Sequence, residues 1–146
     1  MNEYRFEDLY IGQEEVFSVT VTEEMMNMFL EISDDTNPLH NDSEFAISQG
    51  YQGRVVYGLL TTSLISKLVG VLLPGKYCLL QGVEVKYSKP VYIGDVLFVK
   101  GIVEELHESV QRVVIKVTIT NQDEKKVVKG KTEVGFLERE VSLQGS

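Results

Sequence analysis

The chain has 146 residues, 43% of them hydrophobic, and a formal net charge of −8 at pH 7. This length suits one domain with a sizeable core, and we expect residues 1–146 to form a single domain. The negative charge argues against nucleic acid or an anionic membrane surface as a partner, because both repel an acidic protein.

The single cysteine, Cys78, excludes an internal disulfide and any metal site built from several cysteines. It lies beside an apolar run, which predicts an inert, half-buried thiol. The first residues do not resemble a signal peptide, and no apolar run approaches the length that spans a bilayer. We therefore expect a cytoplasmic enzyme or binding domain.

The first elements in chain order are a strand and two helices. Residues 17–21 alternate between apolar and polar side chains, which predicts a short strand. Thr22 is placed to cap a helix over residues 23–33, whose acidic start suits the positive end of the helix dipole. A shorter helix, preceded by polar capping residues, is predicted over residues 44–47.

The helix over residues 23–33 carries three methionines, Met25, Met26 and Met28. Methionines at helical spacing are expected to pack in the core. A flexible wall for an acyl chain is the alternative interpretation.

A second helical pattern is longer and more apolar. Apolar residues recur from Leu60 to Leu72 with a period near 3.6, and Pro74-Gly75 ends the pattern. Lys67 is its only charged residue. We expect this helix to be buried on most sides, as the axis of a wrapped sheet would be.

The second half of the chain predicts strands. Residues 77–87, 90–103, 110–120 and 126–137 are rich in β-branched and aromatic residues and are separated by turn residues. The last two turns read as the tips of long hairpins. The predicted fold is α+β: one antiparallel sheet wrapped around one central helix. The edge strands of this sheet would leave backbone N–H and C=O groups unpaired. Pairing with a second copy of the chain would satisfy these groups, which predicts at least a dimer.

The loop before the central helix carries the chemistry. Asp35 and His40 lie five residues apart across the turn signal Asn37-Pro38, as general acid–base catalysis would need. On spacing alone, Asp35, Asn37 and Asp42 also fit ordinary turn and cap residues. A metal site with one histidine on a proline-containing loop is poorly supported, so none is predicted.

The segment Asp35-Thr36-Asn37-Pro38-Leu39-His40, followed by Asp42 and Ala46, resembles the signature of the MaoC-like family, which includes the R-specific enoyl-CoA hydratases. Further family-like segments follow in the expected order: residues 56–64, 73–76 and 89–95. The resemblance covers roughly residues 8–137. It implies the hot-dog fold, a sheet wrapped around a helix, usually dimeric through its sheet edges.

The resemblance also implies a reaction, the reversible addition of water to a trans-2-enoyl thioester of coenzyme A or acyl carrier protein. The thioester is then the substrate, and no cofactor is implied. Asp35 and His40 match the catalytic pair, and the main-chain amide of Gly58 matches the group that binds the thioester oxygen. Ser63 matches a family serine and is a candidate for substrate binding, while Asn37 and Pro38 are expected to support the loop.

Two positions depart from the family pattern. Tyr57 stands where a histidine is common, and Asp34 stands where a glycine is common. Because Tyr57 lies beside the expected thioester oxygen site, it is a further candidate for substrate binding.

Two other functions remain open. A hot-dog thioesterase would often carry a carboxylate on the central helix, and residues 59–73 contain none. A non-catalytic acyl-CoA-binding protein is the second alternative. Arg54, Lys86 and Lys89 are candidates for contacts with the phosphates of coenzyme A, although solvated charge is the favoured interpretation for each.

Overall fold

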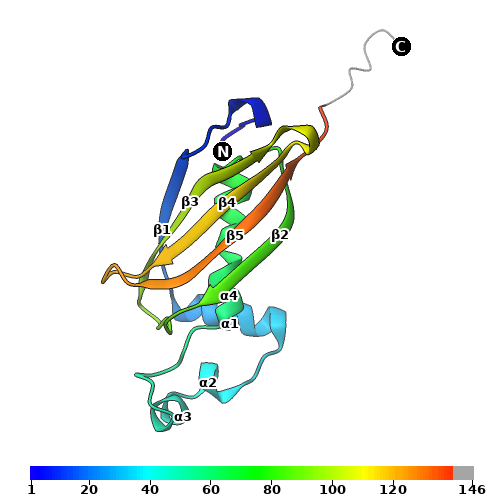
Figure 1. Ribbon diagram of the computed structural model, residues 1–146. Helices are drawn as coiled ribbons and strands as arrows, with labels where there is room; N and C mark the ends of the chain where they lie inside the picture. The colour runs from blue at the N-terminus through cyan, green and yellow to red at the C-terminus, as the bar shows by residue number, and fades with distance from the viewer. Residues whose placement is uncertain (140–146) are drawn as a thin grey trace.

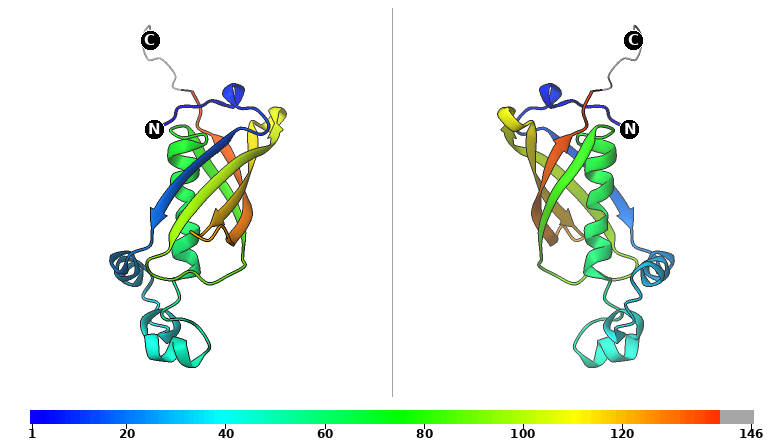
Figure 2. Two further views of the ribbon diagram at one scale, coloured as in Figure 1. Left: turned by 90° about the vertical axis from the view of Figure 1, so that its left-hand side faces the viewer. Right: turned by 90° about the vertical axis from the view of Figure 1, so that its right-hand side faces the viewer.

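The computed structural model describes residues 1–139, so residues 140–146 of the predicted domain lie outside the described part. Five strands form one antiparallel sheet with the order β1-β3-β4-β5-β2. Figures 1 and 2 show this sheet curving around one long helix, which confirms the predicted α+β hot-dog architecture. The strands are β1 (Glu14–Thr20), β2 (Cys78–Tyr87), β3 (Val96–His107), β4 (Arg112–Thr120) and β5 (Lys126–Phe136).

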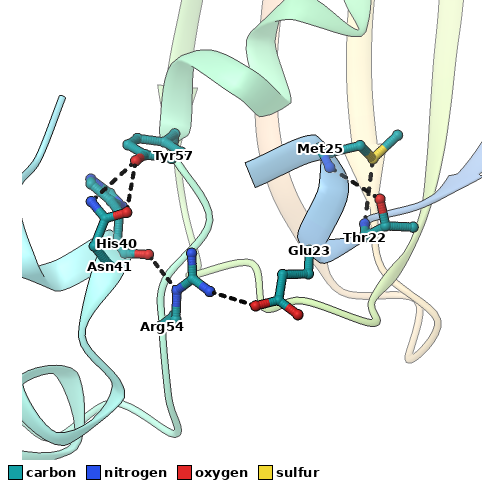
Figure 3. Close-up of polar contacts among 7 residues, drawn as sticks. All are labelled: Thr22, Glu23, Met25, His40, Asn41, Arg54 and Tyr57. Carbon is teal, nitrogen blue, oxygen red and sulfur yellow. Dashed lines mark hydrogen bonds and ion pairs between the residues drawn. The ribbon is translucent and has the colours of Figure 1, made fainter. Parts of the chain in front are cut away.

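The helical segments are short, apart from the central helix. They are η1 (Phe6–Asp8), α1 (Glu23–Ser33), α2 (Pro38–Asn41), α3 (Ser43–Ser48), α4 (Gly58–Ser63), α5 (Ile65–Lys67), η2 (Leu68–Leu72) and η3 (Glu108–Val110). Helix α1 has the predicted bounds, and the Thr22 hydroxyl caps it by accepting a hydrogen bond from the Met25 amide at 3.2 Å. Figure 3 includes this cap.

The prediction for the methionines of α1 is confirmed only in part. Met26 is fully buried and Met25 is partly buried, whereas Met28 is 57% exposed. Only one side of α1 faces the core, so the third methionine lies on the solvent side.

The central helix consists of α4, α5 and η2 laid end to end. The Ser63 hydroxyl donates to the Leu60 carbonyl at 2.5 Å, and the Leu64 amide bonds instead to the Thr61 carbonyl at 3.2 Å. This competition for one carbonyl interrupts the regular pattern between α4 and α5. The helix ends before Pro74-Gly75, as predicted.

The core lies between the central helix and the concave face of the sheet. On β3, Gly101 allows a close approach, because a Cβ there would lie 3.0 Å from Leu68 Cδ2. The helix contributes Leu60, Ile65, Leu68 and Val69 to the core, and the three middle strands contribute Leu97, Val99, Ile115, Val117, Ile119, Val128 and Val134.

Burial of the helix on most sides is not confirmed. Leu59 is 68% exposed, and Ser63, Ser66 and Lys67 are also exposed. The sheet of one chain covers one side of the helix and leaves the other side open. Within residues 1–139, no helix is long and apolar enough to cross a membrane.

The strand predicted over residues 90–103 starts later than expected. A turn precedes it, in which Asp95 Oδ2 accepts from the Tyr92 amide at 2.9 Å and Gly94 has a φ of +96°. The two long hairpins, β3–β4 and β4–β5, are confirmed. Cys78, at the start of β2, is half-buried, as predicted, and burial raises the pKa of its thiol to about 11.

Candidate active site

The residues singled out in the sequence meet where α4 begins, at the end of the sheet that carries α1, α2 and α3 (Figure 1). Two neighbouring cavities lie there. The pair cavity, of about 250 Å³, is lined by Phe29, Asp35, His40, Tyr57, Gly58, Leu59 and Tyr87. It therefore brings together the predicted Asp35 and His40 with the predicted helix start at Gly58.

The second cavity, of about 280 Å³, is called the valine cavity here because four valines line it, Val55, Val56, Val91 and Val128. Thr61, Tyr51 and residues 88–90 complete its wall. The two cavities share three residues, His40, Gly58 and Tyr87. A ligand bound at Gly58 would therefore touch both.

His40 is held in one orientation by main-chain contacts. Its Nδ1 lies 2.7 Å from the Val55 carbonyl oxygen. A carbonyl can only accept, so Nδ1 carries the proton and Nε2 is the acceptor of the neutral ring. The imidazole also stacks on the ring of Tyr57, with centroids 4.3 Å apart. The ring therefore offers a basic nitrogen without free rotation.

Asp35 follows the end of α1. The chain turns at Asp34, whose φ of +55° is left-handed, and the Asn37 amide then donates to Asp35 Oδ1 at 3.1 Å. Asn37 also caps α2, since its Oδ1 accepts from the Leu39 amide at 2.9 Å, and Pro38 is the first residue of that helix. The bend expected between Asp35 and His40 is therefore the start of α2, a single helical turn capped by Asn37. Asp35 Oδ2 has no hydrogen-bond partner within residues 1–139.

Tyr57 connects the two members of the pair. It is 2% exposed, and its hydroxyl donates to the Asp35 carbonyl at 2.9 Å and accepts from Asn41 Nδ2 at 3.2 Å. Its ring lies against Phe29 on one side and His40 on the other. Figure 3 shows Tyr57 beside His40 and Asn41. Tyr57 lines the pair cavity, but its hydroxyl is directed to the loop, and the substrate contact stays a prediction.

Tyr87, which the sequence did not single out, explains why residue 58 is glycine. A Cβ on Gly58 would lie 3.1 Å from the Tyr87 ring. The Tyr87 hydroxyl lies 2.5 Å from Thr62 Oγ1, which fixes the ring beside the helix start. No local pattern at the end of β2 indicates this contact, because it joins residues distant in the sequence.

Ser63, the predicted substrate-binding serine, lines neither cavity. Its hydroxyl is bonded to the Leu60 carbonyl of the preceding turn. Thr61 lines the valine cavity instead. Two residues along a helix are about 200° apart around its axis, so Thr61 and Ser63 lie on different sides.

The three predicted cationic contacts have different surroundings. The Arg54 side chain is only 18% exposed; its Nε donates to the His40 carbonyl at 2.7 Å, and it forms an ion pair with Glu23 at 3.4 Å (Figure 3). Solvated charge is therefore wrong for Arg54, which supports α2. Lys89 is exposed and lines the valine cavity, whereas Lys86 lines neither cavity of the site.

Within residues 1–139, no three His, Cys, Asp or Glu side chains form a cluster suited to a metal ion.

Comparison with known proteins places these features in a family. Residues 10–127 match the family described as MaoC like domain. A 3-hydroxybutyryl-CoA dehydratase of Methylorubrum extorquens is 34% identical over 82% of this chain and 76% of its own length. The (R)-specific enoyl-CoA hydratases of Rhodospirillum rubrum and Aeromonas caviae are 33% and 35% identical over 62% and 61% of this chain, and the matched regions span 62% and 66% of those proteins.

Solved structures agree with the sequence matches. The unliganded R-hydratase PhaJ1 from Pseudomonas aeruginosa superposes with a TM-score of 0.86 at 29% identity, covering 97% of this chain and 91% of that chain. The (R)-hydratase from A. caviae gives the same TM-score of 0.86 at 30% identity, covering 90% of this chain and 99% of that one. These relatives are named as hydratases or dehydratases, which are hydro-lyases. The chain belongs to the MaoC like domain family and has the hot-dog fold.

Proposed function

We propose that this protein is an R-specific enoyl thioester hydratase, which adds water reversibly to a trans-2-enoyl thioester and so also acts as a 3-hydroxyacyl thioester dehydratase. The names of its relatives support this reaction class. The observation that carries the proposal is the pair cavity, in which Asp35 and His40 face the helix start at Gly58.

The reaction needs a base for water, an acid for C2 and a donor for the thioester oxygen. In the proposed mechanism, Asp35 and His40 hold one water. The pair accepts a proton from this water as its oxygen bonds to C3, and the π electrons move toward the thioester oxygen. The pair then returns a proton to C2, so the enzyme ends unchanged.

The start of α4 is suited to the negative charge that develops on the thioester oxygen. The first amides of a helix have no partners inside the helix, and the helix dipole is positive at this end. A preorganised donor of this kind stabilises the transition state more than the ground state. The hydrogen bonds from His40 Nδ1 to the Val55 carbonyl and from the Asn37 amide to Asp35 Oδ1 also support the proposal, because they fix the pair before substrate binds.

We propose that the thioester carrier is coenzyme A or acyl carrier protein. We also propose a homodimer formed through β2, an edge strand. The apolar side chains exposed on this strand and on the open side of the helix support this assembly: Leu59, Leu79, Leu80 and Val83.

The test is to mix the protein with crotonyl-CoA and to follow the loss of the conjugated enoyl absorbance. Asp35→Asn and His40→Gln should each lower kcat by about a hundredfold or more, because each removes one proton-transfer group. Chiral analysis of the product should show the R isomer.

Matched controls are available for both substitutions. His107 is the last residue of β3 and Asp123 lies in the β4–β5 turn, both outside the two cavities. His107→Gln and Asp123→Asn should keep full activity. Absence of turnover with short, medium and long enoyl chains would sink the hydratase proposal. Thioester hydrolysis that survives Asp35→Asn would favour the thioesterase alternative.

A further inference from the structure

Thr61 carries a hydroxyl with no hydrogen-bond partner. The residue is 1% exposed, and its Oγ1 is buried without a partner in the described part of the chain. Thr61 also lines the valine cavity. A buried polar group without a partner costs free energy, so its presence at a cavity wall calls for an explanation.

The two residues after Thr61 show how helical hydroxyls are usually satisfied. Thr62 Oγ1 donates to the Gly58 carbonyl at 3.1 Å, and Ser63 Oγ donates to the Leu60 carbonyl at 2.5 Å. The corresponding acceptors for Thr61 are the Gly58 carbonyl, three residues back, which already accepts from the Thr62 hydroxyl, and the Tyr57 carbonyl, four residues back. That oxygen already accepts from the amides of Leu60 and Thr61, at 3.1 and 3.2 Å. With both lone pairs used, it is closed to the Thr61 hydroxyl.

The cavity wall offers no replacement. The deeply buried side chains that line it beside Thr61 are Val56, Val91 and Val128, which are 3%, 5% and 1% exposed and contain no polar atom. His40, Tyr87 and Ser88 also line the cavity, and none of them forms a hydrogen bond with Thr61; the Tyr87 hydroxyl is bonded to Thr62. The partner left for the Thr61 hydroxyl is therefore a water or a bound molecule in the cavity.

We propose that the valine cavity receives the acyl chain and that Thr61 selects chains with a hydroxyl or carbonyl oxygen near C5. This inference rests on the proposed function, which sets the thioester oxygen at Gly58. Thr61 lies three residues further along the helix, about 4.5 Å of rise. An extended chain advances roughly 1.2 Å per bond, so an acyl chain running along the helix reaches Thr61 after about four bonds.

The substrate class is therefore a trans-2-enoyl thioester with an oxygen near its fifth carbon. Apolar chains of the same length would leave the Thr61 hydroxyl buried and unpaired. A site built around such a hydroxyl discriminates strongly against the analogue that lacks the partner oxygen.

The experiment compares kcat/KM for trans-2-hexenoyl-CoA and its 5-hydroxy analogue in the unmodified protein and in Thr61→Val, which removes the hydroxyl and keeps the shape. We expect the unmodified protein to prefer the 5-hydroxy substrate by at least about tenfold, and Thr61→Val to abolish or reverse that preference. Thr61→Ser, which keeps a hydroxyl, should retain it.

Thr132→Val is the matched control. Thr132 lies on β5, is fully buried and also has an unpartnered hydroxyl, but it does not line the valine cavity. Its substitution should leave the substrate ratio unchanged. An equal ratio in the unmodified protein and in Thr61→Val would overturn the inference and would assign the Thr61 hydroxyl a purely structural role.

A binding measurement separates this inference from the proposed reaction. Calorimetry with hexanoyl-CoA and 5-hydroxyhexanoyl-CoA needs no turnover. Tighter binding of the hydroxylated thioester, lost in Thr61→Val, would support the selectivity even if no enoyl thioester were hydrated. Equal binding of the two thioesters together with normal hydration of crotonyl-CoA would overturn the selectivity and leave the hydratase proposal standing.

Discussion

The rings of His40 and Tyr57 are stacked, with centroids 4.3 Å apart and planes inclined by 29°. The same tyrosine donates a hydrogen bond to the main chain of Asp35. One buried side chain therefore contacts both members of the proposed catalytic pair. A residue that departs from the family pattern in the sequence is, in the structure, the residue that holds the pair together.

Tyr57→Phe tests this bracing role. The substitution keeps both ring contacts and removes the hydrogen bonds to Asp35 and Asn41, so we expect a loss of about 1–2 kcal/mol in the free energy of unfolding. We also expect a lower kcat with little change in KM, because Asp35 loses its positioning contact. Denaturant unfolding and steady-state kinetics measure the two effects. Tyr92→Phe, outside both cavities, is the control; an equal kcat loss there would contradict the role of Tyr57.

The contact between Gly58 and Tyr87 predicts a coupled pair. Gly58→Ala brings a Cβ to 3.1 Å from the Tyr87 ring and should destabilise the fold by about 1–3 kcal/mol. Tyr87→Ala removes the obstacle, so the double variant should lose less stability than the sum of the single variants, by at least about 0.5 kcal/mol. A double-mutant cycle of unfolding free energies measures this coupling.

Gly70 provides the comparison for Gly58. It lies in the same central helix, and a Cβ there would meet no atom within 4 Å. Gly70→Ala should raise the unfolding free energy by about 0.5–1 kcal/mol, because alanine loses less backbone entropy in a helix. Equal effects of the two alanine substitutions would refute a specific conflict with Tyr87.

Val83→Lys tests the proposed dimer. Val83 lies on the edge strand β2 and is 42% exposed. A lysine there should oppose pairing with a second copy and give a monomer in sedimentation velocity. Val16→Lys, on the opposite edge strand β1 where Val16 is 55% exposed, should remain dimeric. A dimer in Val83→Lys would exclude β2 as the contact.

Cys78 should react slowly with thiol reagents. Burial raises the pKa of its thiol from 9.0 to about 11, so near pH 8 its thiolate is about a hundredfold rarer than in the unfolded chain. Iodoacetamide labelling followed by mass spectrometry, with and without denaturant, measures the difference. Equal labelling rates would contradict the buried thiol.

The same thiol predicts a pH dependence of stability. Below pH 9 the Cys78 thiol keeps its proton in both the folded and the unfolded chain, so it does not make the unfolding free energy depend on pH. Between pH 9 and about 11 the unfolded chain loses the proton first, and the unfolding free energy should fall as the pH rises. Denaturant unfolding at several pH values measures this fall. The fall should be smaller in Cys78→Ala, and an equal fall in both proteins would contradict the role of the thiol.

Local signals account for what the sequence predicted well. The bounds of α1 follow from the Thr22 cap and the acidic first turn, and the end of the central helix follows from Pro74-Gly75. These features depend on neighbours in the chain, so they are visible in the sequence. The break after Ser63 was missed, because a helical period does not show which hydroxyl will occupy a backbone carbonyl.

By itself, the sequence determined the α+β class, the order of the elements, and the loop that carries Asp35 and His40. The tertiary structure alone decided which residues surround that pair. It brought Tyr87 from β2 against Gly58, directed Nδ1 of His40 to Val55, and brought Thr61 rather than Ser63 to a cavity. The physical reason is that these contacts join residues far apart in the chain, or depend on the rotation of one helix against the sheet, and neither quantity is encoded in local periodicity.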